Sequence, residues 1–171
     1  ERNPVGSYRT RFQLPDGWAG RRTVLHFGGV MSAFYLWLNG ERVGYSQGSM
    51  TPAEFELTPF LRPGENLLAV EVFRWCDGSY LEDQDMWRLS GIFRGVHLVS
   101  TAPQRIDDFA VRTSFDAGHR DAVVSIEPEF GAPGNETLEG WTIEAQLFDA
   151  EGAAVLEAPA VAEVGRPTLA A

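Results

Sequence analysis

The side chains best suited to chemistry are concentrated in one short segment, Arg74–Arg88. It contains four carboxylates, three aromatic side chains and two arginines. Two of the carboxylates could act as an acid–base pair, as in glycosidases, or they could bind a hard cation through oxygen. Aromatic rings beside carboxylates could also hold a sugar, by stacking on its apolar faces and hydrogen-bonding to its hydroxyls. A solvated acidic loop with its aromatic side chains packed inward is the simpler interpretation of the same composition.

Other parts of the chain offer weaker candidates. The glycine-containing stretch Gly44–Ser49 could approach a ligand, although such stretches are more often turns. His26 and His97 occupy strand-like positions and are expected to be structural, and no His/Cys spacing is typical of a zinc site. Cys76 is the single cysteine, which excludes an internal disulfide and fits a reducing compartment such as the cytoplasm.

Alternation of apolar and polar residues with a period of two indicates that β-strands position these side chains. Asn39-Gly40 between two apolar runs predicts a tight hairpin, because both residues tolerate a positive φ. The predicted strands of this part of the chain are 8–14, 23–27, 33–38, the return strand through 43 and 45, 67–75 and 92–99.

Helix signals are few. Residues 49–54 could form one helical turn, and Thr58 followed by Pro59 reads as a cap with proline at the first helical position. The sequence therefore predicts an all-β fold.

Composition limits the class of protein. The 171 residues are 44% hydrophobic and 12% aromatic, enough for a folded core, and the net charge is -10. A negative surface repels phosphate, so neither nucleic acid nor an anionic membrane is an expected partner. No apolar run approaches the roughly 18 residues of a membrane helix. The chain starts at Glu1 without an initiator methionine, so we expect it to be part of a longer polypeptide.

A domain boundary is predicted in the polar, proline-containing stretch 100–104, which gives domains 1–102 and 103–171. The second domain contains three strand-like runs, 106–115, 122–130 and 141–148, separated by glycine-rich turns. This spacing favours an immunoglobulin-like β-sandwich without a disulfide. Three or four strands are too few to close such a sandwich, so we expect the second domain to be partial.

The motif Asp77–Arg94 closely resembles a signature of the large bacterial β-galactosidases of glycoside hydrolase family 2. The segments 30–40, 43–47 and 54–66 are similar to the same family, in the same order. The resemblance implies a first domain that is a galactose-binding-type jelly-roll sandwich, N-terminally truncated here, and a partial immunoglobulin-like second domain. It also implies a third domain beyond this chain, a TIM barrel that carries the two catalytic glutamates.

The resemblance also implies roles for individual residues. Asp85 matches the aspartate that reaches into the family's active site, where it binds sodium and the galactosyl group. Gln47 and Asp77 match positions that help to hold a structural magnesium ion. No catalytic residue is expected in this chain, because both members of the family's glutamate pair come from the barrel. The resemblance therefore argues against the interpretation of two loop carboxylates as the glycosidase pair.

The function expected from this resemblance is the N-terminal portion of a retaining β-galactosidase that cleaves terminal β-galactosides such as lactose. Its expected partners are the β-galactoside, the TIM barrel of the same polypeptide and further copies of the enzyme in a homo-oligomer. A non-catalytic carbohydrate-binding module is the alternative, since the fold alone does not separate the two. A glucuronidase or mannosidase of the same family is disfavoured by the galactosidase-like motif 83–87.

Overall fold

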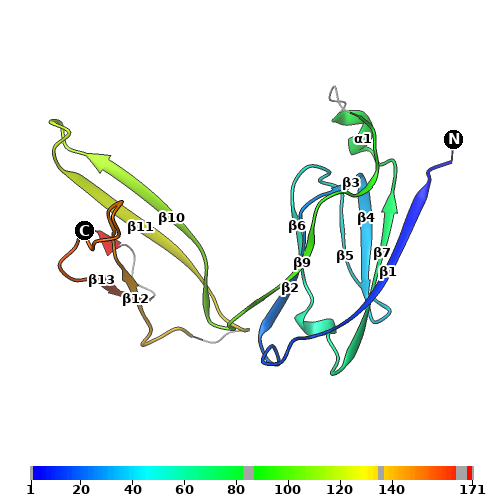
Figure 1. The fold of residues 1–171 in the computed structure, drawn as a ribbon, viewed down its shortest axis with the longest axis horizontal. Helices are drawn as coiled ribbons and strands as arrows, with labels where there is room; N and C mark the ends of the chain where they lie inside the picture. The colour runs from blue at the N-terminus through cyan, green and yellow to red at the C-terminus, as the bar shows by residue number, and fades with distance from the viewer. Residues whose placement is uncertain (1, 83–86, 135–136, 165–168, 171) are drawn as a thin grey trace. The chain divides into compact units, whose positions relative to one another are not determined.

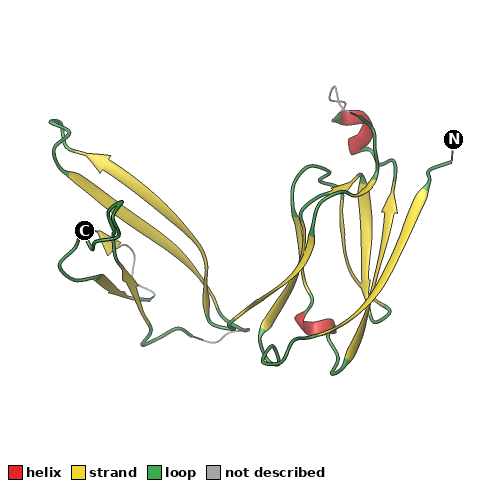
Figure 2. Cartoon of the chain, in the orientation of Figure 1, coloured by secondary structure: helices red, strands yellow, loops and turns green. Residues whose placement is uncertain are grey.

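The structure is a computed structural model that describes residues 2–82, 87–134, 137–164 and 169–170. It divides into two compact units, Glu1–Ala102 and Pro103–Ala171. Strands form most of the described regular structure (Figure 2), which confirms the expected all-β class. The elements of the first unit are β1 (Val5–Gln13), β2 (Arg22–Phe27), β3 (Val30–Met31), β4 (Ala33–Leu38), β5 (Glu41–Ser46), β6 (Ala53–Glu56), η1 (Thr58–Phe60), β7 (Glu65–Phe73), α1 (Gly78–Leu81), β8 (Gly91–Ile92) and β9 (Val96–Thr101).

The first unit is a jelly-roll sandwich of two facing antiparallel sheets (Figure 1). One sheet has the strand order β1-β7-β4-β5 and the other β6-β2-β9, and β3 pairs with β8 beside them. Alternation along β4 and β7 turns one side of each strand into the sandwich, as predicted for Leu68, Val70 and Val72. The buried core cluster comes from both sheets and from the connection before η1; it comprises Leu25, Phe27, Val30, Phe34, Leu36, Leu38, Leu57, Leu68, Val70 and Val72.

The predicted hairpin is confirmed at Asn39-Gly40, where both residues have positive φ, 54° and 87°. Its two strands, β4 and β5, are paired from Leu38↔Glu41 at the turn to Phe34↔Ser46. The Asn39 side chain also reaches outside the hairpin: its Nδ2 donates to the Phe60 carbonyl, and its Oδ1 accepts from the backbone N–H of Leu67.

Three local predictions were wrong. No helical turn forms over 49–54, because residues 53–56 pair with β2 as strand β6. The predicted strand over 92–99 is divided into β8 and β9, and the Gly95 carbonyl between them accepts from the N–H of Gly28. Thr58 lies inside η1 rather than capping it, and its hydroxyl accepts from the backbone N–H of Thr23 on β2.

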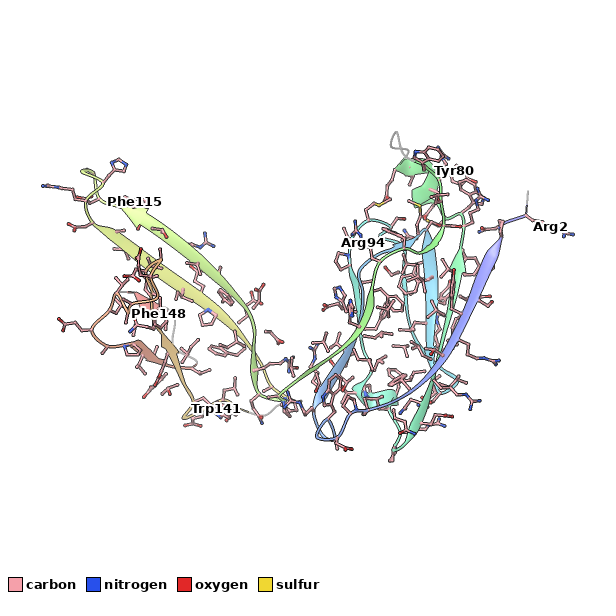
Figure 3. The ribbon with its side chains drawn as sticks, in the orientation of Figure 1. Arg2, Tyr80, Arg94, Phe115, Trp141 and Phe148 are labelled. Atoms are coloured by element: carbon pink, nitrogen blue, oxygen red, sulfur yellow. The ribbon has the colours of Figure 1, made fainter. Side chains whose placement is uncertain are left out.

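The second unit is built around a long hairpin of β10 (Arg105–Phe115) and β11 (Ala122–Gly131). A shorter pair is formed by β12 (Thr142–Ala145) and β13 (Ala160–Glu163), and β14 (Leu169–Ala170) pairs with β11. The predicted strand 141–148 therefore ends early, and β13 was not predicted at all. Large apolar side chains such as Phe115, Trp141 and Phe148 remain more than half exposed on this unit (Figure 3).

Candidate functional site

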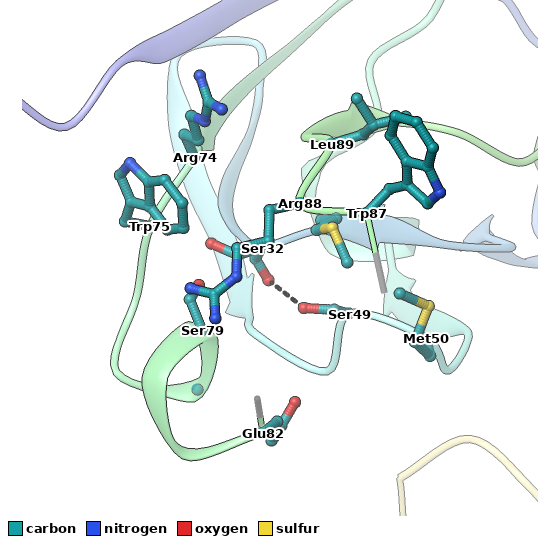
Figure 4. A pocket seen from close by; sticks show the side chains of 12 residues that line it. Ser32, Ser49, Met50, Arg74, Trp75, Ser79, Glu82, Trp87, Arg88 and Leu89 are labelled. Carbon is teal, nitrogen blue, oxygen red and sulfur yellow. Dashed lines mark hydrogen bonds between the residues drawn. The ribbon is translucent and has the colours of Figure 1, made fainter. Parts of the chain in front are cut away.

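A pocket of about 270 Å³ lies where several segments of the first unit meet, at the end of β7. It is lined by residues from the β3–β4 connection, the turn after β5, the segment that follows β7, α1 and the segment 87–89 (Figure 4). Its polar lining includes Ser32, Ser49, Arg74, Glu82 and Arg88. Much of the segment Arg74–Arg88, in which sequence analysis placed the chemistry, therefore lines this pocket.

Backbone and hydroxyl hydrogen bonds hold the far-separated walls together. The Ser32 hydroxyl donates to the Phe73 carbonyl at 3.0 Å, which joins the start of β4 to the end of β7. The Ser49 hydroxyl donates in turn to the Ser32 carbonyl at 3.3 Å (Figure 4). Sequence analysis did not identify Ser32 as a lining residue, because nothing in its local sequence reports which strands become neighbours, whereas Ser49 ends the stretch Gly44–Ser49 that was considered as a loop approaching a ligand.

Asp77 starts the short helix α1 that forms one side of the pocket. Its Oδ1 accepts from the backbone N–H of Gly78 at 2.9 Å, and the Ser79 hydroxyl accepts from the N–H of Cys76 at 3.1 Å. Two residues before Asp77, the backbone of Trp75 is held by the Asn3 side chain. Oδ1 of Asn3 accepts from the Trp75 N–H at 3.0 Å, and its Nδ2 donates to the Trp75 carbonyl at 2.7 Å. The loop is therefore anchored to the segment that precedes β1 and to its own helix.

Aromatic and cationic side chains are stacked on this anchored loop. The rings of Trp75 and Tyr80 are stacked with centroids 6.1 Å apart, and the guanidinium groups of Arg74 and Arg88 lie 5.2 and 5.9 Å from the Trp75 ring centroid. Tyr80 is 65% exposed and Trp87 is 85% exposed. The interpretation of a loop with inward-packed aromatics is therefore wrong for these two rings, which are open to a ligand or to another part of a larger protein.

Some of the predicted site residues are described by the structure and others are not. Asp85, predicted to contact substrate and sodium, lies outside the described residues, as do Asp83, Gln84 and Met86. Glu82, to which no catalytic role was given, is exposed at the mouth of the pocket. Gln47 and Asp77, the two predicted magnesium ligands, are both described and both exposed.

Gln47 and Asp77 are 30 residues apart in sequence, and both act on the side chain of Tyr45, Gln47 through a hydrogen bond and Asp77 through its charge. The Tyr45 hydroxyl donates to Oε1 of Gln47 at 2.7 Å. Partial burial raises the pKa of Tyr45, and nearby Cys76, Tyr35 and Asp77 raise it further by their negative charge. One amide oxygen and one carboxylate have the chemistry that Mg²⁺ prefers but are far short of its six ligands. Within the described residues, no group of three His, Cys, Asp or Glu side chains is arranged to hold a metal ion.

None of the three histidines lines this pocket. His26 is paired with Glu54 at 2.9 Å and stacks with His97 across β2 and β9, in agreement with structural roles. His119 has a φ of 52° in the turn between β10 and β11. None of the helices in the described part of the chain is long and apolar enough to cross a membrane.

Comparison with known proteins defines the class. The model of the glycosyl hydrolases family 2 sugar binding domain matches residues 1–103, so the chain belongs to this family. A β-galactosidase of Priestia megaterium is 48% identical over 157 residues, 92% of this chain, and one of Vibrio vulnificus strain CMCP6 is 50% identical over 161 residues, 94% of this chain. The chain spans 15% of the length of each.

Solved structures share the fold across both units. A Bifidobacterium dentium β-glucuronidase in complex with coumarin-3-O-glucuronide matches with a TM-score of 0.80 and 24% identity, over 99% of this chain and 33% of its own. A β-glucuronidase from an uncultured Clostridium species matches with a TM-score of 0.76 and 26% identity, over 97% of this chain and 29% of its own.

Proposed function

We propose that this chain is the N-terminal portion of a retaining β-galactosidase and supplies a substrate-binding lobe rather than the catalytic glutamates. The observation that carries the proposal is the 48–50% identity to proteins named β-galactosidase over more than nine-tenths of the chain. The exposed aromatic and charged side chains beside the pocket support it, because they suit a lobe that closes over a sugar. Lactose and other terminal β-galactosides are the proposed substrates.

A β-glucuronidase is the second candidate, favoured by the names of the solved structures. Those structures have about half the identity of the β-galactosidases, and the fold is shared across the family. A glucuronide differs from a galactoside in its carboxylate, and an enzyme that binds this group needs cationic side chains beside it. Turnover of paired chromogenic galactosides and glucuronides by the full-length protein separates the two candidates. A non-catalytic carbohydrate-binding module is the third, and it predicts turnover of neither.

Asp85 is the residue that we propose to act on substrate. Its carboxylate would anchor a sodium ion, the ion would take a sugar hydroxyl as ligand, and the galactosyl ring would be held over a nucleophile from the barrel of the same polypeptide. Gln47 and Asp77 would contribute two ligands to a structural magnesium ion. The complete enzyme is proposed to be a cytoplasmic homo-oligomer.

The test compares two neighbouring carboxylates in the full-length enzyme. A charge-assisted contact is worth about 1.5–3 kcal/mol, so Asp85→Asn is expected to lower kcat/KM for a chromogenic β-galactoside by about 10- to 100-fold or more. It should also weaken activation by sodium. Glu82→Gln is the matched control and should have a much smaller effect. Equal small effects from both variants, with and without sodium, would contradict the role of Asp85.

A second measurement concerns the chain by itself. Without the barrel it has no catalytic glutamate pair, so the purified chain is expected to show no β-galactosidase activity above a buffer blank. Turnover that survives repurification would contradict the proposal that the catalytic glutamates come from the barrel and not from this chain.

A further inference from the structure

The outer face of the sheet β1-β7-β4-β5 carries a cluster of aromatic side chains that is separate from the pocket. Tyr35 lies at its centre, with ring centroids 4.8 Å from Tyr45, 5.8 Å from Phe73 and 5.9 Å from Trp37. Tyr35 and Trp37 alternate with the buried Phe34, Leu36 and Leu38 along β4, and therefore point away from the core. The guanidinium of Arg42 lies 4.4 Å from the Tyr35 ring centroid and covers it, whereas Trp37 borders an open groove.

The groove results from one small residue in a cross-strand row. Trp37 pairs with Ala69 on β7, and Ala69 pairs with Arg9 on β1. Because Ala69 has the shortest side chain of the three, a depression of about 500 Å³ opens between the indole and the arginine. The neighbouring row adds Glu71 and Ser7, which are directly paired and also line the groove.

The charges in this groove are not used within the described part of the chain. Arg9 and Glu71 are diagonal neighbours of opposite sign, yet neither side chain makes a hydrogen bond or an ion pair with a described residue. On the same two strands, Arg11 and Glu65 are also diagonal neighbours and are bonded at 2.9 Å. Arg9 and Glu71 are therefore free to serve a ligand, one as a donor and the other as an acceptor.

We infer that this groove binds a neutral pyranose ring of a glycan. The apolar C–H face of a sugar stacks on the indole of Trp37, and the hydroxyls at the edge of the sugar ring remain free to form hydrogen bonds. Vicinal hydroxyls donate to the Glu71 carboxylate and accept from the Arg9 guanidinium. A neutral polyol can hydrogen-bond to both charged groups at once, whereas an anion would pair with Arg9 alone and a cation with Glu71 alone. The site does not depend on the proposed galactosidase activity, and it uses none of the residues of the pocket at the end of β7.

The test is affinity electrophoresis of the full-length protein through gels that contain soluble β-1,4-galactan. The end of a galactan chain can also enter a catalytic pocket, so the contribution of the groove is measured by comparing the unmodified protein with variants of groove residues alone. The unmodified protein is expected to be retarded, and Trp37→Ala to weaken the apparent affinity by about tenfold or more because it removes the stacking surface. Trp37→Phe should keep part of the affinity.

Variants of the two charged side chains test the groove independently, in case the tryptophan variant does not fold. Arg9→Gln and Glu71→Gln should each weaken retardation by about five- to tenfold, while Arg11→Gln, on the same face of β1, should not change it. All variants should hydrolyse a small chromogenic galactoside within about twofold of the unmodified rate, since the groove is not part of the catalytic machinery.

Three results would overturn the inference. The first is no retardation of the unmodified protein by β-1,4-galactan. The second is equal retardation of the unmodified protein and of the Arg9 and Glu71 variants. The third is a change of oligomeric mass in Trp37→Ala without any loss of retardation, which would assign this face to contacts between protein chains instead.

Discussion

Asn39 and Asn66, which are 27 residues apart, are joined by a 2.8 Å hydrogen bond from Nδ2 of Asn39 to Oδ1 of Asn66. Asn66 is completely buried, and its Oδ1 also accepts from the backbone N–H of Arg62 at 2.9 Å. Its Nδ2 donates to the carbonyls of Arg62 and Gly64 at 3.0 and 3.1 Å. The pair thus connects the β4–β5 hairpin to the turn that starts β7.

Replacement of Asn66 by leucine is expected to destabilise the first unit strongly. It would remove four hydrogen bonds in a part-buried turn, those to the N–H of Arg62, to the carbonyls of Arg62 and Gly64 and from Nδ2 of Asn39, and each such bond contributes about 0.5–1.5 kcal/mol. Urea unfolding should therefore show a loss of at least about 2 kcal/mol. Asn3→Leu, which also removes two side-chain bonds to backbone but at an exposed site, is the control and should cost less, since water replaces the lost partners.

A second prediction concerns the contact that closes the sandwich between β5 and β6. A Cβ atom at Gly44 would overlap the ring of Phe55, which itself packs edge-on against Phe27 and Phe34. Gly44→Ala is expected to lower the free energy of unfolding by about 1–3 kcal/mol through overpacking. Phe55→Leu should restore part of this loss in the double variant. A strictly additive double-mutant cycle would show that the two residues do not compete for the same space.

The two oxygen ligands that Gln47 and Asp77 can offer predict weak metal binding by the chain itself. Two protein oxygens cannot satisfy the near-octahedral shell of six that Mg²⁺ demands. Calorimetric titration of the chain with magnesium chloride should therefore detect weak binding or none. Sub-micromolar binding that is lost in Asp77→Ala would contradict this expectation and would point to a complete site within the chain.

Tyr45 predicts a dependence of stability on alkaline pH. Burial and nearby negative charge raise its pKa above the ordinary value of 10.0, so the folded chain holds this proton more tightly than the unfolded chain does. The resulting stabilisation is present below pH 10.0 and is lost as the pH rises through the folded pKa. Unfolding free energies measured from pH 8 to 11 should fall less steeply in Tyr45→Phe. Parallel pH profiles of the two proteins would contradict this assignment.

Strand positions and the hairpin at Asn39-Gly40 were predictable because they depend on local properties: side-chain alternation and the tolerance of two residues for positive φ. The family was also recognisable from sequence, since its signature 77–94 is one continuous motif. The class of the fold and the segment that contains the pocket therefore followed from residues close together in the chain.

Features that depend on long-range pairing were decided only by the tertiary structure. The residues at 53–56 became a strand because β2 offered a partner, and Ser32 joined the pocket because β4 lies beside β7. The groove beside Trp37 exists because the register places Ala69 between the indole and Arg9. No local pattern reports a register between strands that are 30 to 60 residues apart, since it is set by which apolar faces can be buried together.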